Sequence, residues 1–179
     1  MRQPVLSTYK ILKEKAFNSD IDETWIDWAI EMMEAGFESD NLYELAGISR
    51  PYNQFELHDL TNKVLNDLSL DYSDRKLVIK NYVYFIITNS VNIPEAYIGT
   101  LRELKDICID LDMEKEYFDF YLLYFAKDDL TESENQWYWD GANRSNIDDI
   151  ITEQFVKCKR NLSRGNKNER QAHLRKRNC

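Results

Sequence analysis

Apolar residues recur three and four positions apart through most of this chain, which is the spacing of one face of an α-helix. Residues 22–35 show it most clearly, because Trp25, Trp28 and Met32 form one stripe. Gly36 follows, a residue suited to the position after a helix. Only 5 Gly and 3 Pro occur, too few turn-forming residues for a sandwich or barrel of many short strands. The sequence therefore predicts an all-α protein.

Capping and turn residues divide the rest of the chain into further helices. Ser7 is placed to cap a first helix, and Asn53 with Glu56 has the spacing of a capping box. Pro94 occupies a first-turn position. We expect an irregular bundle of six to eight helices. The predicted helices span about residues 7–16, 22–35, 40–46, 53–68, 75–91, 94–111, 113–127 and 147–162.

Residues 75–91, "RKLVIKNYVYFIITNSV", are ambiguous because Val, Ile, Tyr and Phe favour strands. Length favours a buried helix, capped by Ser73, since no partner strand can be found elsewhere. An apolar helix followed by a short capped helix with a Leu-x-x-Leu step occurs both in residues 25–46 and in residues 82–104. A short helical-repeat arrangement is therefore an alternative to the bundle.

The length of 179 residues fits one domain, which we place at residues 1–162. Residues 163–179 lack an apolar face and are expected to form a basic, disordered tail. The predicted core is made of residues at inward-facing helical positions. They are Trp25, Trp28, Met32, Leu60, Val64, Val83, Ile86, Leu101, Leu104, Phe120 and Tyr124.

Charge is divided unevenly along the chain. The first 156 residues hold 14 Lys and Arg against 31 Asp and Glu, a net charge of −17. The remaining 23 hold nine against one, a net charge of +8. Such asymmetry concerns long-range partners rather than the fold. A nucleic acid would be repelled by the acidic body and attracted by the basic end.

Catalytic and cofactor motifs are missing from the sequence. The two histidines, His58 and His173, accompany no GxSxG nucleophile motif, and there is neither a GxxxxGK[ST] nor a GxGxxG loop. The three cysteines form no CxxC pair, so no metal site and no cofactor are predicted. Close acidic pairs such as Asp128 with Asp129 leave an enzyme with clustered carboxylates as an alternative.

An acidic stripe runs along the helix predicted at residues 22–35, opposite its tryptophans. Like charges at this spacing disfavour an isolated helix by about 0.2–0.5 kcal/mol per pair, and no lysine offsets them. Either this is a solvated face with cationic neighbours supplied by the fold, or it is a docking face for a basic protein partner. Its members are Glu23, Asp27, Glu31, Glu34 and Glu38.

The polar segment "NQWYWDG" contains Trp137, Tyr138 and Trp139 in succession. In an extended segment alternate side chains point to opposite sides, so all three cannot face the core. The tryptophans either pin the loop to the domain or serve as partly exposed anchors, since Trp and Tyr dominate binding hot spots. We take Trp137 and Trp139 as candidate contact residues.

The basic end offers an alternative function, a nucleic-acid-associated accessory protein that attracts phosphates through this segment. Sequence readout would need a folded element that is not evident there. The candidate residues are Lys157, Lys159, Arg160, Arg164, Lys167, Arg175, Lys176 and Arg177.

The pattern "WIDWAIEMMEAGFESDNLYELAGI", a Trp-x-x-Trp-Ala helix, a Gly stop and a short Asn-Leu-x-x-Leu-Ala-Gly helix, resembles small uncharacterised helical proteins of bacterial and phage genomes. Some of these resemble immunity proteins of toxin systems. The resemblance implies a cytosolic, non-catalytic inhibitor that masks a toxin. No signal peptide or membrane span is evident, so we expect a cytoplasmic location. The leading hypothesis is a non-catalytic binding module that docks a basic protein partner.

Overall fold

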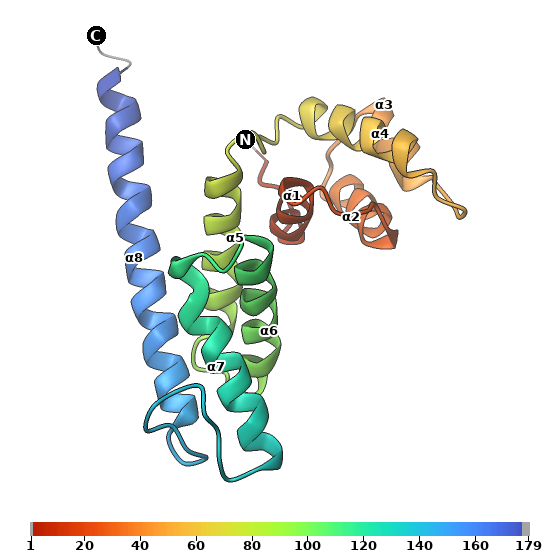
Figure 1. The fold of residues 1–179 in the computed structure, drawn as a ribbon. Helices are drawn as coiled ribbons and strands as arrows, with labels where there is room; N and C mark the ends of the chain where they lie inside the picture. The colour runs from red at the N-terminus through yellow and green to blue at the C-terminus, as the bar shows by residue number, and fades with distance from the viewer. Residues whose placement is uncertain (1, 177–179) are drawn as a thin grey trace. The chain divides into compact units, whose positions relative to one another are not determined.

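The structure, a computed structural model, describes residues 2–176, with the side chains of residues 2–163. The described residues form eight helices and no strand, which confirms the predicted all-α class (Figure 1). No helix among them is long and apolar enough to cross a membrane. The helices are α1 (Thr8–Ala16), α2 (Glu23–Glu34), α3 (Asp40–Ala46), α4 (Gln54–Asp67), α5 (Arg75–Ser90), α6 (Pro94–Asp110), α7 (Lys115–Glu132) and α8 (Ile147–Lys176).

Contacts between residues divide the chain into two compact units, unit 1 (residues 1–82) and unit 2 (residues 83–179). Helix α5 contributes its first half to unit 1 and its second half to unit 2. The predicted division into a helical domain over residues 1–162 and a disordered tail over 163–179 stays a prediction, because the side chains of 164–179 lie outside the described residues.

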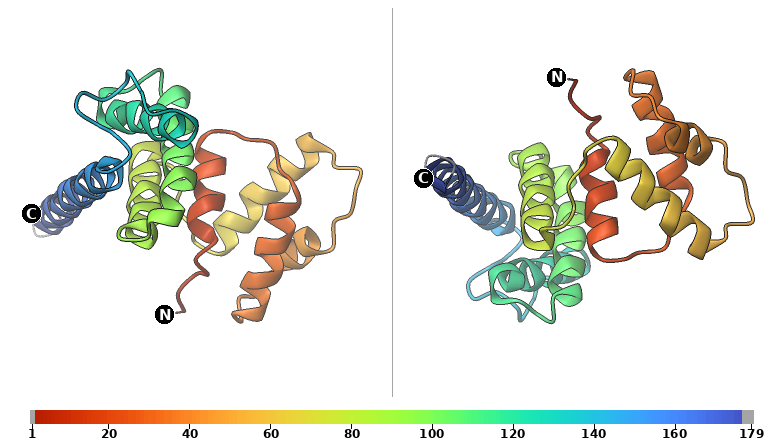
Figure 2. Two further views of the ribbon diagram at one scale, coloured as in Figure 1. Left: turned by 90° about the horizontal axis from the view of Figure 1, so that it is seen from below. Right: turned by 90° about the horizontal axis from the view of Figure 1, so that it is seen from above.

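The core of unit 1 is built on the two tryptophans of α2. Trp25 and Trp28 meet edge to face, with ring centroids 5.9 Å apart. Trp28 Nε1 donates to Thr8 Oγ1 of α1 at 2.9 Å, so the buried indole keeps a polar partner. Helix α2 also packs on α3, and α3 packs on α4. Figure 2 shows α1 to α4 from two further sides.

Helix starts in unit 1 follow the capping residues, with two exceptions. The Asn53 side chain accepts from Phe55 N in the first turn of α4, as predicted. The sequence offered either Ser39 or Asp40 as the start of the short helix before it, and the Ser39 side chain caps α3 by accepting from Leu42 N. Ser7 precedes α1 but makes no capping bond, and its hydroxyl donates instead to the Glu31 carboxylate. The predicted cap of α5 was also wrong. Asp74 Oδ1 accepts from Leu77 N at 3.0 Å, whereas Ser73 bonds to the Asp71 carboxylate.

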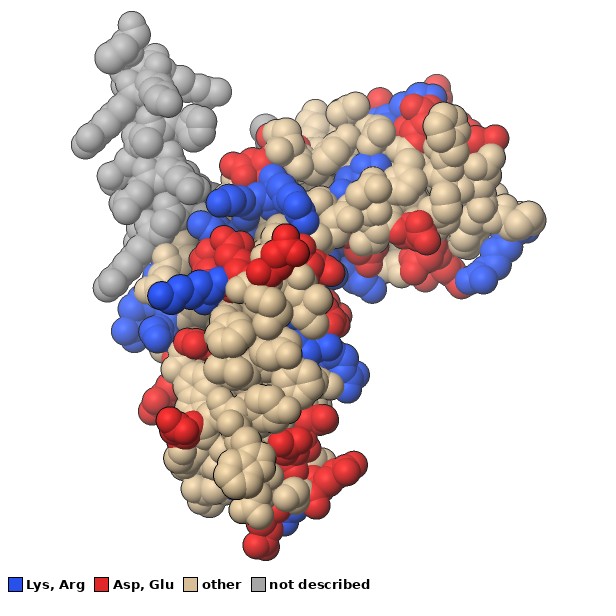
Figure 3. Space-filling model, viewed as in Figure 1, with Lys and Arg blue, Asp and Glu red and all other residues tan. Residues whose placement is uncertain are grey.

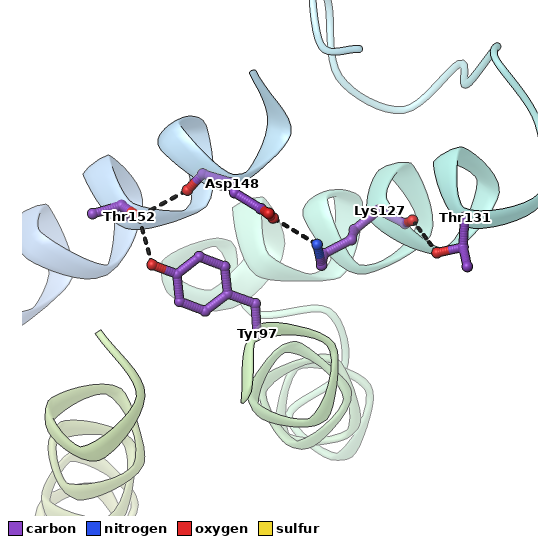
Figure 4. Close-up of polar contacts among 5 residues, drawn as sticks. All are labelled: Tyr97, Lys127, Thr131, Asp148 and Thr152. Carbon is purple, nitrogen blue, oxygen red and sulfur yellow. Dashed lines mark hydrogen bonds and ion pairs between the residues drawn. The ribbon is translucent and has the colours of Figure 1, made fainter. Parts of the chain in front are cut away.

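Unit 2 contains α6, α7 and α8, of which α6 and α7 share the most extensive interface. At its centre the ring of Phe155 on α8 meets Tyr97 of α6 at 5.5 Å and Phe120 of α7 at 5.9 Å between centroids. Two polar contacts reinforce this packing (Figure 4). The Tyr97 hydroxyl bonds to Thr152 Oγ1 at 2.6 Å, and Lys127 Nζ pairs with Asp148 Oδ1 at 2.5 Å.

All but two of the predicted core residues are buried. The exceptions are Ile86 of α5 and Tyr124 of α7, which are half-buried, while their neighbours Ile87 and Leu123 are fully buried. Both helices carry apolar residues all the way round. Periodicity alone therefore could not decide which of two adjacent side chains faces inward.

Candidate protein-docking site

Helix α7 has two apolar faces, of which one is buried and the other is partly exposed. Its inner face is buried in unit 2, through Tyr117, Phe120, Leu123, Ala126 and Leu130. Its outer side carries Phe118, Tyr121 and Phe125 at helical spacing. A surface helix of a globular protein normally has a polar outer face. Phe118 is exposed, whereas Tyr121 and Phe125 are half-buried, so the outer side of α7 presents partly exposed apolar area. Exposed apolar patches are a common feature of interaction sites.

The rings on this side form a continuous row. Phe118 and Tyr121 stack with centroids 5.8 Å apart, and Tyr121 meets the edge of Phe125 at 5.0 Å. Tyr138, from the loop before α8, stacks on Phe125 at 5.2 Å and so extends the row beyond the helix. We call these four rings with Trp137 the aromatic face. Figure 3 shows uncharged side chains gathered over α7, with Asp and Glu side chains at the edges.

The loop that carries Trp137 is held by one side chain. Gln136 Nε2 donates to the carbonyl oxygens of Trp139 at 2.6 Å and Ala142 at 3.0 Å. Gln136 Oε1 accepts from the backbone N–H groups of Tyr138 and Trp139, both at 2.8 Å. These four hydrogen bonds hold the backbone that follows Trp137 against the Gln136 side chain. Its own side chain is left 90% exposed.

The other half of the loop is fixed to α7 and α8. Arg144 Nε donates to the carbonyl of Leu130 at 2.8 Å, which ties the loop to the end of α7. Asn146 Nδ2 donates to Gly141 O at 3.0 Å, and Asn146 Oδ1 accepts from Asn143 N at 2.8 Å. The structure therefore separates the two candidate tryptophans: Trp137 projects from an ordered loop, whereas Trp139 is half-buried.

Acidic residues continue the aromatic face along α7. Asp128, Asp129 and Glu132 follow Phe125 at three, four and seven positions, which keeps them on the same side of the helix. Asp128 and Glu132 are exposed. The nearby Lys127 is engaged by Asp148 and does not neutralise them. The surface consists of an aromatic row with a negatively charged end.

The acidic stripe of α2 is shorter than predicted. All five carboxylates are exposed, but the helix ends at Glu34 and the backbone turns at Gly36, whose φ is +84°. Glu38 therefore lies in the following loop and not on the helix. The prediction of one helical stripe through Glu38 was wrong, because a left-handed residue breaks the helical spacing before it.

Neighbouring residues engage part of this stripe. Arg50 Nη2 lies 3.4 Å from Glu23 Oε2, and the Ser7 hydroxyl donates to Glu31. In the described part of the chain, Asp27 and Glu34 have neither an ion pair nor a hydrogen bond to a side chain. The fold thus supplies polar partners at two positions and leaves two carboxylates free for solvent or for a binding partner.

Of the basic candidates near the C-terminus, three have described side chains. Lys157 and Arg160 are exposed on α8, and Lys159 Nζ lies 5.9 Å from the ring centre of Tyr84. The side chains of the other five candidates, Arg164, Lys167, Arg175, Lys176 and Arg177, lie outside the described residues. Nucleic-acid binding by this segment stays a prediction.

Groups with catalytic potential are scattered. His58 lines a hollow of about 550 Å³ in unit 1 beside Phe55 and Glu56, where Asp59 pairs with Lys63 at 2.7 Å. Among the described residues no group of three or more His, Cys, Asp or Glu side chains could hold a metal ion.

The two described thiols are poor nucleophiles. Burial raises the pKa of Cys158 to about 12, with a further contribution from the charge of Glu116. Burial also raises the pKa of Cys108, and Glu114 adds to the effect. Because the thiolate is the reactive form, neither cysteine is activated near neutral pH.

The sequence contained a signal for the aromatic face that the prediction did not use. From α7 the predicted core included only Phe120 and Tyr124. A second set at positions 118, 121 and 125 also has helical spacing, on the side of α7 away from the buried Leu123 and Leu130. Two apolar stripes on one helix indicate a face left over once the core is formed. Nothing in the residue pattern indicated that Gln136 would hold the loop.

Comparison with protein-family models, with curated proteins and with solved structures finds no match for this chain.

Proposed function

We propose that this chain is a cytoplasmic, non-catalytic binding module that docks a basic protein partner, in the manner of an immunity or inhibitor protein. The observation that carries the proposal is Trp137, which is 90% exposed on a loop closed by four hydrogen bonds of Gln136. The next residue, Tyr138, stacks on Phe125 of α7, so the exposed indole adjoins the row of rings along the chain.

The loop geometry favours binding over a merely solvated surface. Association costs free energy for every side chain and loop that must be ordered. The backbone around Trp137 is already fixed by Gln136, and Tyr138 is already stacked on Phe125. A partner would therefore lose little to ordering this loop. Tryptophan and tyrosine at the centre of an interface are the usual hot-spot residues.

Charge supports a basic partner. The first 156 residues carry a net charge of −17, and the aromatic face ends in Asp128 and Glu132. Complementary charge raises association rates and rejects acidic competitors. The free carboxylates of Asp27 and Glu34 on α2 provide a second acidic surface, in unit 1, with the same preference. Inhibition of a toxin is one form that such docking would take.

The test is selection of binding peptides from a random displayed library against the intact chain. The affinities of the selected peptides are then measured for the wild type, for Trp137→Ala and for Phe55→Ala. Trp137→Ala is expected to weaken the selected basic peptides at least tenfold, as about 1.4 kcal/mol of binding free energy corresponds to a factor of ten. Phe55→Ala is the matched control, because Phe55 is 86% exposed but lies on α4 in unit 1. Its removal is expected to leave affinity unchanged.

Two results would overturn the proposal. One is equal affinity of the wild type and the Trp137→Ala variant for every selected peptide. The other is a set of selected peptides with no excess of Lys and Arg over the starting library. Circular dichroism of each variant checks that the helices are retained.

A further inference from the structure

We infer that the aromatic face binds arginine in preference to lysine. The partner segment then presents a guanidinium group to the rings of α7 and to the carboxylates at their end. This inference rests on the proposed function and adds the chemistry by which the partner is recognised.

The first observation is that several other aromatic rings of this chain have a Lys or Arg side chain close to the ring. Lys105 Nζ lies 5.0 Å from the ring centre of Tyr124, a ring that meets Phe125 of the aromatic face edge to face at 5.1 Å. In unit 1, Arg75 Cζ lies 4.8 Å from the centre of the Phe17 ring, and Arg50 Cζ lies 5.3 Å from that of Tyr52. A cation over an aromatic ring is thus a repeated contact in the molecule.

The aromatic face lacks that contact. Among the described residues no Lys or Arg lies over Phe118, Tyr121, Phe125 or Tyr138. Phe118 is 37% exposed and Tyr138 is 40% exposed, so the two ends of the row are open to solvent. A partner cation would complete the arrangement that Lys105 already makes with Tyr124.

The second observation is the pair of exposed carboxylates that follow Phe125 on α7. Asp128 and Glu132 are exposed on the side of α7 that carries Phe125, three and seven positions further on. One group that stacks on a ring and also bonds a carboxylate is a guanidinium, because it is planar, weakly hydrated and has five N–H donors in a fixed fork. A lysine ammonium is strongly hydrated and offers no flat surface to stack. The combination of rings and acids therefore favours arginine.

The experiment uses two synthetic peptides of equal length and charge, one alternating Leu and Arg and one alternating Leu and Lys. Their dissociation constants are measured by calorimetry on the intact chain at one fixed salt concentration. We expect the arginine peptide to bind about tenfold more tightly, a difference of about 1.4 kcal/mol. Equal affinity for the two peptides would overturn the inference.

A pair of charge-matched variants separates site recognition from general attraction to an acidic protein. Asp128→Asn with Glu132→Gln removes two charges beside the aromatic face, and Asp27→Asn with Glu34→Gln removes two from α2. The first variant is expected to abolish the arginine preference, and the second to keep it. Equal preference in both variants would contradict the inference.

The Trp137→Ala variant distinguishes failure of this inference from failure of the proposed function. If Trp137→Ala weakens both peptides alike and the wild type shows no arginine preference, docking on the aromatic face holds and arginine reading is wrong. If Trp137→Ala changes neither affinity, both are wrong.

Discussion

Glu14 is a residue whose environment disfavours its own charge. Its side chain is largely enclosed on α1, with Oε1 3.7 Å from Lys10 Nζ. Neither Glu14 Oε2 nor the neighbouring Trp25 Nε1 completes a hydrogen bond among the described residues. Burial raises the pKa of the Glu14 carboxyl, and the charge of Lys10 opposes the rise without cancelling it. The ionised carboxylate is therefore held at a cost to stability.

Glu14→Gln is expected to raise the melting temperature at pH 7. The pKa of Glu14 is higher in the folded chain than the ordinary 4.5, so the folded chain favours the protonated carboxyl. The stability that protonated Glu14 contributes is complete below pH 4.5 and is lost as the pH rises through the folded pKa. The advantage of the variant should thus be small at pH 4 and grow toward pH 7. Calorimetric scans across this range measure it. Glu153→Gln, at an exposed position of α8, serves as the control. A difference independent of pH would show that burial of the charge is not the cause.

At the scale of single elements, the start of α5 depends on Asp74 and not on Ser73. Asp74→Ala removes the acceptor for Leu77 N. It should lower the free energy of unfolding by about 1 kcal/mol, the usual cost of losing a cap. Ser73→Ala removes only a hydroxyl contact to Asp71 and should change it by less than about 0.5 kcal/mol. Urea unfolding of both variants checks the order, and the reverse order would contradict the assignment of the cap.

Helix α2 allows its two interpretations to be separated. Asp27 has Glu23 and Glu31 four positions away on either side. Asp27→Lys replaces two repulsive pairs by two attractive ones, each change being worth about 0.2–0.5 kcal/mol. We expect greater stability in urea unfolding, with Asp27→Asn giving about half the gain.

The functional outcome of Asp27→Lys with Glu34→Lys decides what the stripe does. If α2 is a docking surface, this double variant should slow association with the selected basic peptides, because long-range charge acts mainly on the association rate. If association and affinity are unchanged while the fold is intact, the stripe of α2 is a solvated face. The aromatic face in unit 2 would then account for docking without it.

At the scale of the whole molecule, the opposed charges of the body and the C-terminal segment test the nucleic-acid alternative. If the alternative is right, the intact chain binds RNA or DNA at low salt. This binding should weaken steeply as the salt concentration rises. The truncation should begin after Ser163, because Phe155 and Leu162 of α8 are buried in unit 2. Loss of binding in residues 1–163 would support the alternative. Failure of the intact chain to bind at low salt would remove it.

Local interactions explain what the sequence determined. Helical periodicity, the scarcity of Gly and Pro, and the side chains of Ser39 and Asn53 act within a few residues of the chain. They were sufficient to predict the all-α class, most helix limits and most of the core. The acidic surface of α2 was also visible, because exposed charge follows from the position opposite a buried stripe.

Tertiary structure decided the features that depend on residues far apart in the chain. Ser7 bonds Glu31 rather than its own helix, and Arg50 approaches Glu23 from another loop. Helix α7 carries apolar residues on more than one face, so only packing against α6 and α8 selects its buried face and leaves the aromatic face outside. Within one loop, the stacking of Tyr138 on Phe125 and the bonds of Gln136 leave Trp137 exposed and Trp139 half-buried. Burial is a property of the three-dimensional neighbourhood, which identical residue types two positions apart do not share.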